Sequence, residues 1–189
     1  MKKVVFLLII ALLGLSTRGL AQKYITKTGH ISFYSDAPLE DIEAQNDQVN
    51  AALDVENGDF VFKVLMKSFE FEQALMQEHF NENYVESDKF PNSTFKGKVL
   101  NISDINFASE GSYEVNVNGD LNIHGVTNEV NCKGTFVIGD GHIRATAVFE
   151  VSPEDYKISI PSAVAENIAK TIEVTVEVDL AKYDQVAQK

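Results

Sequence analysis

The chain has 189 residues, of which 44% are hydrophobic, and its formal net charge is −12 at pH 7. A protein this acidic repels phosphate backbones, so we expect no nucleic-acid partner. Cys132 is the only cysteine, which excludes an internal disulfide, but the chain is long enough for one domain to bury a core without such crosslinks.

The first 21 residues have the pattern of a secretory signal peptide. Lys2 and Lys3 precede an apolar run over 4–15, and Gly19-Leu20-Ala21 is a small-residue cleavage site. The apolar run is too short for a transmembrane helix, so we expect a protein that is not membrane-spanning. Cleavage would leave residues 22–189, with a charge of −15 because the segment holds three basic and no acidic residues. We expect this mature domain to be periplasmic or secreted.

Alternation of apolar and polar residues, typical of half-buried strands, begins directly after this segment. It predicts strands over residues 24–35 and 41–55. In the second strand the alternation slips between Ala44 and Val49. We therefore expect a β-bulge near residues 46–48.

The dipeptide Asn57-Gly58 is typical of a type I′ turn between two paired strands. With such a turn, facing residues have numbers that add to 115, so Val55 would face Phe60 and Leu53 would face Phe62. Every such pair is apolar on one face of the hairpin.

The connection over residues 70–93 is too long for a hairpin. It carries apolar residues at helical spacing and therefore predicts a short helix, with these members: Phe71, Leu75, Met76, His79 and Phe80. A further strand is expected over residues 94–102.

A long hairpin follows over residues 113–123 and 126–138, joined by His124-Gly125. A two-residue turn there makes facing residues add to 249, so that Val117 faces Cys132. The apolar residues of both strands then share one face.

The turn Asp140-Gly141 continues this hairpin into another strand. Facing residues would add to 281, which places Ile143 opposite Ile138 and Phe149 opposite Cys132.

The last connection, over residues 153–170, carries a short amphipathic piece with Ser162 as its expected N-cap. The final strand, over residues 171–180, has the cleanest alternation in the chain. Together these elements predict an all-β fold, a roughly eight-stranded antiparallel up-and-down barrel with short helices closing one end.

The search for catalytic residues finds no constellation that would make the protein an enzyme, and we expect no cofactor. The four histidines are scattered, and His124 is explained by its turn. Glu78, His79, Glu82 and Glu86 lie at helical spacings, so a metal-dependent enzyme built on this helix remains an alternative, although such residues are usually just solvated.

The barrel interior is the remaining candidate site. Gly97, Gly119 and Gly134 lie among large side chains, which indicates gaps, although a solid core is an equally open interpretation. The residues predicted to line a ligand site are Phe60, Phe62, Met66, Leu75, Met76, Phe80, Tyr84, Phe95, Leu121, Phe136, Phe149, Tyr156 and Val174. Tyr84, Asn83 and Tyr156 are the candidates for contacting a polar headgroup.

Three motifs resemble the YceI-like family: GDLNIHGVT over 119–127, Phe90-Pro91 leading into TFKG over 94–97, and DYKI over 155–158. The resemblance spans nearly all of the mature chain. It departs from the family at residues 154–158, where an Arg and a Gly of the family pattern are missing. The resemblance implies a secreted or periplasmic lipocalin-like barrel that binds polyisoprenoid lipids.

The predicted partner is therefore a hydrophobic small molecule, an isoprenoid lipid or quinone, held by a carrier, sink or stress-related scavenger. A small outer-membrane barrel, with its apolar face toward lipid, is a second alternative because it shares the signal peptide and alternating strands. A homodimer is left open.

Overall fold

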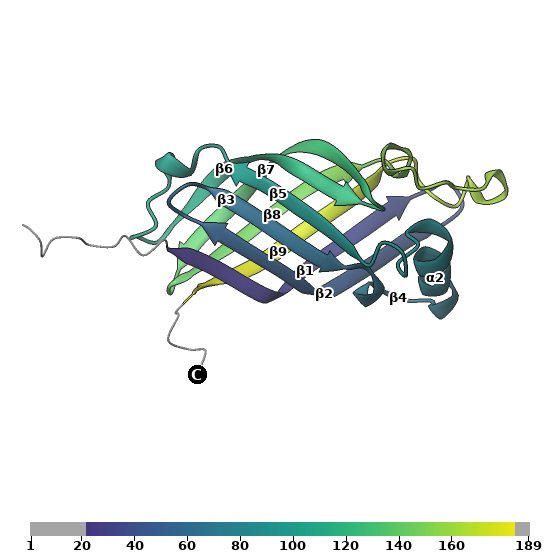
Figure 1. The fold of residues 1–189 in the computed structure, drawn as a ribbon, viewed down its shortest axis with the longest axis horizontal. Coiled ribbons are helices and arrows are strands. Elements are labelled where there is room, and N and C mark those ends of the chain that lie inside the picture. Colours follow the sequence, from purple (N-terminus) through teal and green to yellow (C-terminus); the bar gives the residue numbers. More distant parts are fainter. Residues whose placement is uncertain (1–21, 184–189) are drawn as a thin grey trace, which may run out of the picture.

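The computed structural model describes residues 22–183, so the predicted signal peptide lies outside the described residues. Its strands run diagonally around a common axis (Figure 1). They are β1 (Lys23–Asp36), β2 (Asp41–Asp54), β3 (Asp59–Leu65), β4 (Glu70–Phe71), β5 (Asn92–Val99), β6 (Gly111–Ile123), β7 (Val126–Gly139), β8 (His142–Val151) and β9 (Ile172–Lys182).

Eight of these strands close into a barrel. The hydrogen-bonded order is β1-β9-β8-β7-β6-β5-β3-β2, and β1 also pairs with β2, which completes the circuit. All of these pairings are antiparallel, and the two-residue β4 adds to β2. The predicted all-β antiparallel barrel is confirmed.

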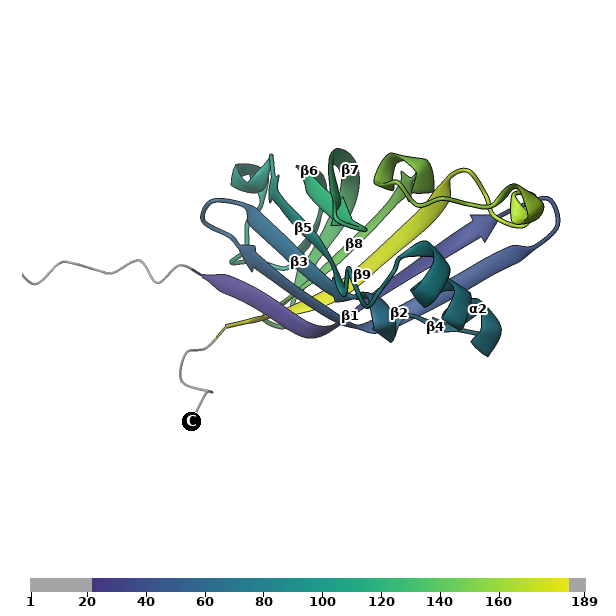
Figure 2. The same cartoon turned by 45° about the vertical axis from the view of Figure 1, so that its right-hand side comes forward.

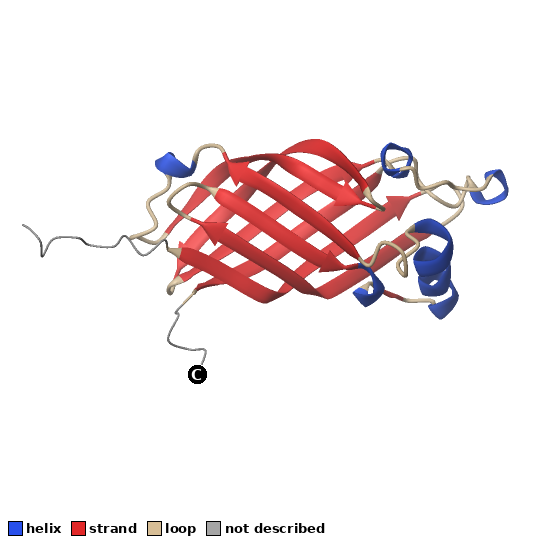
Figure 3. Cartoon of the chain, viewed as in Figure 1, coloured by secondary structure: helices blue, strands red, loops and turns tan. Residues whose placement is uncertain are grey.

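Most of the short helical segments gather at one end of the barrel, and the 3₁₀ turn η3 (Ile102–Asp104) lies at the other end (Figure 3). The helix α2 (Ala74–His79) continues into the π-helical η2 (Phe80–Tyr84), and η4 (Pro153–Tyr156) and η5 (Ser162–Val164) are 3₁₀ turns. Figure 2 shows α2 and the 153–170 segment on opposite sides of this end. The predicted closure at one end is confirmed, but Pro161 and not Ser162 is the N-cap residue of η5.

The His124-Gly125 turn has the predicted geometry. Both residues have positive φ, +53° and +74°, as a type I′ turn requires. The β6–β7 register matches the prediction along its whole length, with Val117 opposite Cys132. A Cβ on Gly125 would lie 2.5 Å from a ring carbon of Phe90, so glycine is required there for space as well as for φ.

The Asp140-Gly141 turn also sets the predicted register, with Ile138 opposite Ile143. The pairing of β7 with β8 ends at Gly134 and Ala147, however, so the predicted pair of Cys132 and Phe149 is wrong. Each strand continues in register with its other neighbour. Beyond Gly134 and Ala147, β7 and β8 therefore separate, although side chains continue to alternate between inward and outward along both strands.

The register predicted for β2 and β3 is wrong by two residues, because Leu53 faces Phe60. The connection is a four-residue loop, residues 55–58, in which only Gly58 has a positive φ, +79°; the N–H of Gly58 donates to the carbonyl of Asp54 at 2.9 Å. A type I′ turn needs two adjacent positive φ values. Because a shift of two residues preserves side-chain parity, the apolar face is unchanged.

The predicted bulge in β2 is confirmed. Gly29 pairs with Val49 and Ile31 with Asn46, so β2 has one more residue than β1 between these points. Asn46 is buried there; its amide donates to the carbonyl of Leu65 at 2.9 Å, and its side-chain oxygen accepts the N–H of Gln48 at 2.9 Å. These bonds satisfy a polar side chain that would otherwise be costly to bury.

The barrel interior is solid at the end opposite the helices. Buried apolar side chains from all eight strands of the barrel and from the 102–105 turn pack together there: Tyr24, Ala51, Leu53, Phe60, Val99, Ile105, Val115, Val117, Phe136, Ile138, Ile143, Ala145, Val178 and Leu180. The alternate residues of β9, Glu173, Glu177 and Asp179, are exposed on the outside. An outer wall facing a bilayer would instead be apolar. Among residues 22–183, no helix is long and apolar enough to cross a membrane.

Candidate functional site

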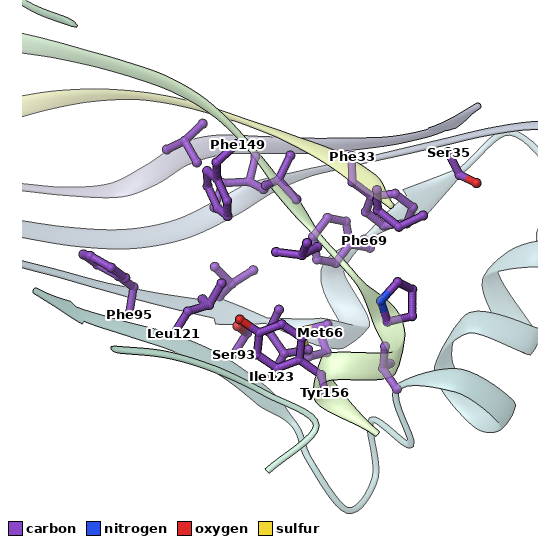
Figure 4. Close-up of a pocket in the computed structure, with 18 of the residues that line it drawn as sticks. Phe33, Ser35, Met66, Phe69, Ser93, Phe95, Leu121, Ile123, Phe149 and Tyr156 are labelled. Atoms are coloured by element: carbon purple, nitrogen blue, oxygen red, sulfur yellow. The ribbon is translucent and has the colours of Figure 1, made fainter. Parts of the chain in front are cut away.

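The half of the barrel nearer the helices contains a cavity of about 370 Å³. This volume lies in the range of small-molecule sites, roughly 300–1,000 Å³. Its walls are mostly hydrocarbon, supplied by the inward faces of the strands and by the segments that cover the end (Figure 4). The barrel is therefore neither a solid core nor an empty tube, but a half-filled one.

Twelve of the thirteen residues predicted from the sequence line this cavity. They are Phe60, Phe62, Met66, Met76, Phe80, Tyr84, Phe95, Leu121, Phe136, Phe149, Tyr156 and Val174. The structure places Leu75 elsewhere, with 60% of its surface exposed on α2. Asn83 is also exposed and does not line the cavity, whereas Tyr84 and Tyr156 do. No ligand contact tests these assignments, so they remain predictions as binding residues.

A cluster of four phenylalanines at the covered end was only partly predicted. The ring of Phe80 lies 5.6 Å from those of Phe33 and Phe69 and 5.1 Å from that of Phe71. Phe33 belongs to β1, where alternation with Ile31 could have identified it as inward-facing. Phe69 lies between two short elements without any periodic pattern, so no comparable signal in the sequence points to it.

A second group of phenyl rings forms the inner end of the cavity. Phe60 lies 4.5 Å from Phe62 and 5.8 Å from Phe136, and Phe62 lies 6.1 Å from Phe95, measured between ring centroids. These four residues line the cavity and also pack against the solid core. They mark where the hollow half of the barrel ends.

The glycines that predicted gaps have a different role. Gly97 and Gly119 face each other across β5 and β6, and the ring of Phe95 lies over both, so that a Cβ on Gly119 would be 2.8 Å from its Cζ atom. Most of the space they leave is therefore occupied by a side chain of the protein itself. Gly134 borders the cavity, and a Cβ there would lie 2.7 Å from the carbonyl of Thr146.

Few polar groups face the cavity, and two of them have partners within the protein. The hydroxyl of Ser93 donates to the carbonyl of Asn122 at 2.8 Å, and that of Ser35 accepts the N–H of Ala169 at 2.9 Å. Tyr156 is buried, and this burial raises the pKa of its phenol above the usual value. The phenol is therefore neutral over the physiological range and can act only as a hydrogen-bonding group.

His124 joins the β6–β7 turn to both segments that cover the cavity, the α2–η2 segment with the residues after it and the 153–170 segment. The sequence did not reveal this role. The Nε2 of His124 lies 2.7 Å from a carboxylate oxygen of Glu86, and its Nδ1 lies 3.1 Å from the carbonyl of Tyr156. Phe90 packs edge-on against the imidazole at 4.6 Å. Both partner atoms are acceptors, so a ring protonated on both nitrogens satisfies both contacts.

We expect Glu86 to stabilise this junction in a pH-dependent way. The hydrogen bond from His124 is the main cause that lowers the pKa of the Glu86 carboxyl from 4.5. A lowered pKa in the folded state contributes stability above the unfolded value and loses it as the pH falls through the folded value. Glu86→Gln should therefore lower the free energy of unfolding at neutral pH, and the difference from the parent should shrink below pH 4.5.

Urea unfolding at a series of pH values measures this difference. The same substitution in a His124→Ala background is the control, and there the difference should change much less with pH. A difference between parent and Glu86→Gln that stays constant as the pH falls would contradict the assignment.

The residues suggested for a metal-dependent enzyme do not assemble into a site. Glu78, His79 and Glu82 are all exposed, although His79 also borders the cavity. Glu86 is bound to His124 instead. Within residues 22–183, no three His, Cys, Asp or Glu side chains lie close enough to hold a metal ion. The structure therefore gives this alternative no support.

The protein is thus a closed antiparallel barrel whose apolar internal cavity has room for one small hydrophobic molecule. Comparison with known families is more specific. The model of the YceI-like domain matches residues 24–180. The chain therefore belongs to the YceI-like family.

Solved structures show the same fold at low sequence identity. A polyisoprenoid binding domain from Saccharophagus degradans, implicated in plant cell wall breakdown, is 13% identical, with a TM-score of 0.73 over 85% of this chain and 98% of that one. BcnA of Burkholderia cenocepacia is 14% identical, with a TM-score of 0.63 over 81% and 96%. The Campylobacter jejuni YCEI protein is 16% identical, with a TM-score of 0.58 over 75% and 85%. No curated protein matches the sequence.

Proposed function

We propose that the protein binds one isoprenoid-type or other long-chain lipid in the cavity and acts as a carrier or sink for it. The apolar cavity carries this proposal, because a long hydrocarbon is the ligand that such a lining favours. The polyisoprenoid binding of the similar Saccharophagus degradans domain supports it. No catalytic group is needed for this function.

The energetics are adequate without strong polar contacts. Burying about ten methylene groups contributes roughly 8 kcal/mol before the cost of association is subtracted. The polar end of the ligand needs only a few hydrogen-bonding groups to fix its orientation. Tyr84 and Tyr156 line the cavity and can supply such groups.

Lipid extraction tests this proposal directly. The mature chain, purified without detergent, should yield a long-chain lipid on solvent extraction and mass spectrometry. After delipidation it should take up a prenyl quinone in equimolar amount. If no lipid co-purifies and the delipidated protein takes up no quinone, lipid binding is refuted.

We also propose that the protein works outside the cytoplasm, in the periplasm or after secretion. The n-region, apolar run and cleavage site over residues 1–21 support this. The intact mass of the protein recovered from the periplasmic or extracellular fraction should correspond to a chain beginning at Gln22. A full-length chain retained in the cytoplasm would contradict it.

A further inference from the structure

The wall of the barrel is open between β7 and β8. The last paired residues are Gly134 and Ala147, beyond which a side slot lies between residues 128–133 of β7 and residues 148–151 of β8, with Ser152 following. Each strand still pairs with its other neighbour, β7 with β6 as far as Val126 and β8 with β9 as far as Val151. The slot is therefore a separation of two ordered strands and not a frayed end.

The side slot borders the main cavity. Six residues line both spaces and come from both strands and the adjoining η4 turn: Val130, Cys132, Phe149, Val151, Ser152 and Tyr156. Figure 4 shows Phe149 and Tyr156 facing the interior from this part of the wall. The same side chains thus have one side toward the ligand cavity and one toward the slot.

The slot has defined ends. At one end the β7–β8 pairing resumes at Gly134. At the other, the side-chain amide of Asn128 donates to the carbonyl of Asp155 at 2.9 Å, which links β7 to η4. Hydrogen bonds therefore frame the opening on both sides.

The covers at the end of the barrel are fastened to it more firmly. The N–H of Leu39 donates to the carbonyl of Glu166 at 3.2 Å, and the side chain of Asn167 donates to Glu40 at 3.1 Å. The N–H of Ala169 donates to Ser35. On the opposite side, Glu86 is held by His124. These contacts hold the covers against the strands, whereas the backbone pairing of β7 with β8 stops before the slot.

The slot also suits the passage of a polar group. Where two strands separate, the backbone N–H and C=O groups along their facing edges need water or another partner. A hydrated slot lowers the cost of moving a polar head past the apolar lining. Its outer rim carries Glu129, Glu150 and Asp155 together with Lys133, so its net charge is negative and an uncharged head is favoured over a phosphate.

We propose that the side slot between β7 and β8 is the portal through which an amphiphile with an uncharged head enters and leaves the cavity. This inference rests on the proposed lipid binding. The tail would pass between Cys132 and Phe149, and the head would follow through the hydrated rim. The covers at the barrel end would stay in place during exchange.

A disulfide across the slot tests the portal. Lys133 and Val148 point outward and would be the next facing outward pair if the register continued. We introduce Lys133→Cys and Val148→Cys in a Cys132→Ala background, so that only the new thiols can pair. If the gap is too wide for a disulfide, a short bismaleimide crosslinker takes its place.

The matched control is Val137→Cys with Arg144→Cys in the same background. This outward pair lies in the closed part of the same two strands. For both proteins, the rate of uptake of a prenyl quinone from phosphatidylcholine vesicles is measured with the crosslink formed and, for the disulfide, after reduction.

Closing the slot should slow uptake and release by at least about tenfold, with little change in the equilibrium affinity. The control crosslink should leave both rates unchanged. Equal rates for the crosslinked and open forms of the variant carrying Lys133→Cys and Val148→Cys would overturn the portal while leaving lipid binding intact. No uptake by the unmodified protein would instead refute the proposed function, and the portal with it.

Discussion

Replacing Phe136 with alanine is expected to lower the free energy of unfolding by about 3–5 kcal/mol. Phe136 is 1% exposed and its ring lies edge-on to that of Phe60 at 5.8 Å. Phe136 packs where the solid core meets the cavity. Side chains that move in from the core side alone cannot replace all of the contacts that the ring makes. Urea unfolding of the delipidated mature protein measures the change.

Val137→Ala is the matched control for this substitution. Val137 is the next residue on β7, points outward and is 45% exposed. Its truncation should cost less than about 1 kcal/mol. Similar losses for the two variants would mean that the inward face of β7 does not carry the packing described above.

Replacing Val174 with tryptophan is expected to weaken binding of a prenyl quinone by at least about tenfold, or about 1.4 kcal/mol. Val174 lines the cavity from β9, between Phe33 of β1 and Phe149 of β8. An indole at this position would occupy space that the ligand tail needs. Because it fills an existing cavity, the variant should remain folded, and its unfolding curve would verify this.

Glu177→Trp controls for the effect of an added indole on the same strand. Glu177 is exposed on the outer face of β9, so binding should be unchanged. Affinity is measured by equilibrium partitioning of the quinone between vesicles and protein. Unchanged affinity in the Val174 variant would show that the lipid does not bind in this part of the cavity.

Most of the fold was accessible from the sequence because the alternation of apolar residues and the turn chemistry agree. His124-Gly125 determines the β6–β7 register, since both residues accept positive φ. Asn57-Gly58 gave a β2–β3 register that is wrong by two residues, because the chain uses a longer loop in which Gly58 alone has positive φ. A shift of two residues leaves each side chain on the same face of its strand, so the inward face was still correctly predicted.

The cavity was less accessible because it depends on how far side chains fill the barrel. Alternation identifies Phe60 and Phe136 as inward, but it does not say whether they meet in the middle. The separation of β7 from β8 leaves no trace in the pattern either, since Cys132 and Phe149 keep their inward parity on both sides of the slot. Leu75 was predicted from helical spacing alone, which does not define which face of α2 is covered.

The role of His124 was missed because its partners are distant in the sequence. Glu86 lies 38 residues away and Tyr156 lies 32 residues away. The turn explains the backbone of His124 fully, and only the folded structure shows that its ring is used as well.

The phenyl rings at the inner end of the cavity set its depth. The depth available to a tail is limited by Phe60, Phe62, Phe95 and Phe136 and not by the barrel wall. Depth is therefore a property of individual side chains, which can be altered without changing the number, tilt or pairing of the strands. Under the proposed function, single substitutions at this boundary would therefore change the length of tail that the same barrel accepts.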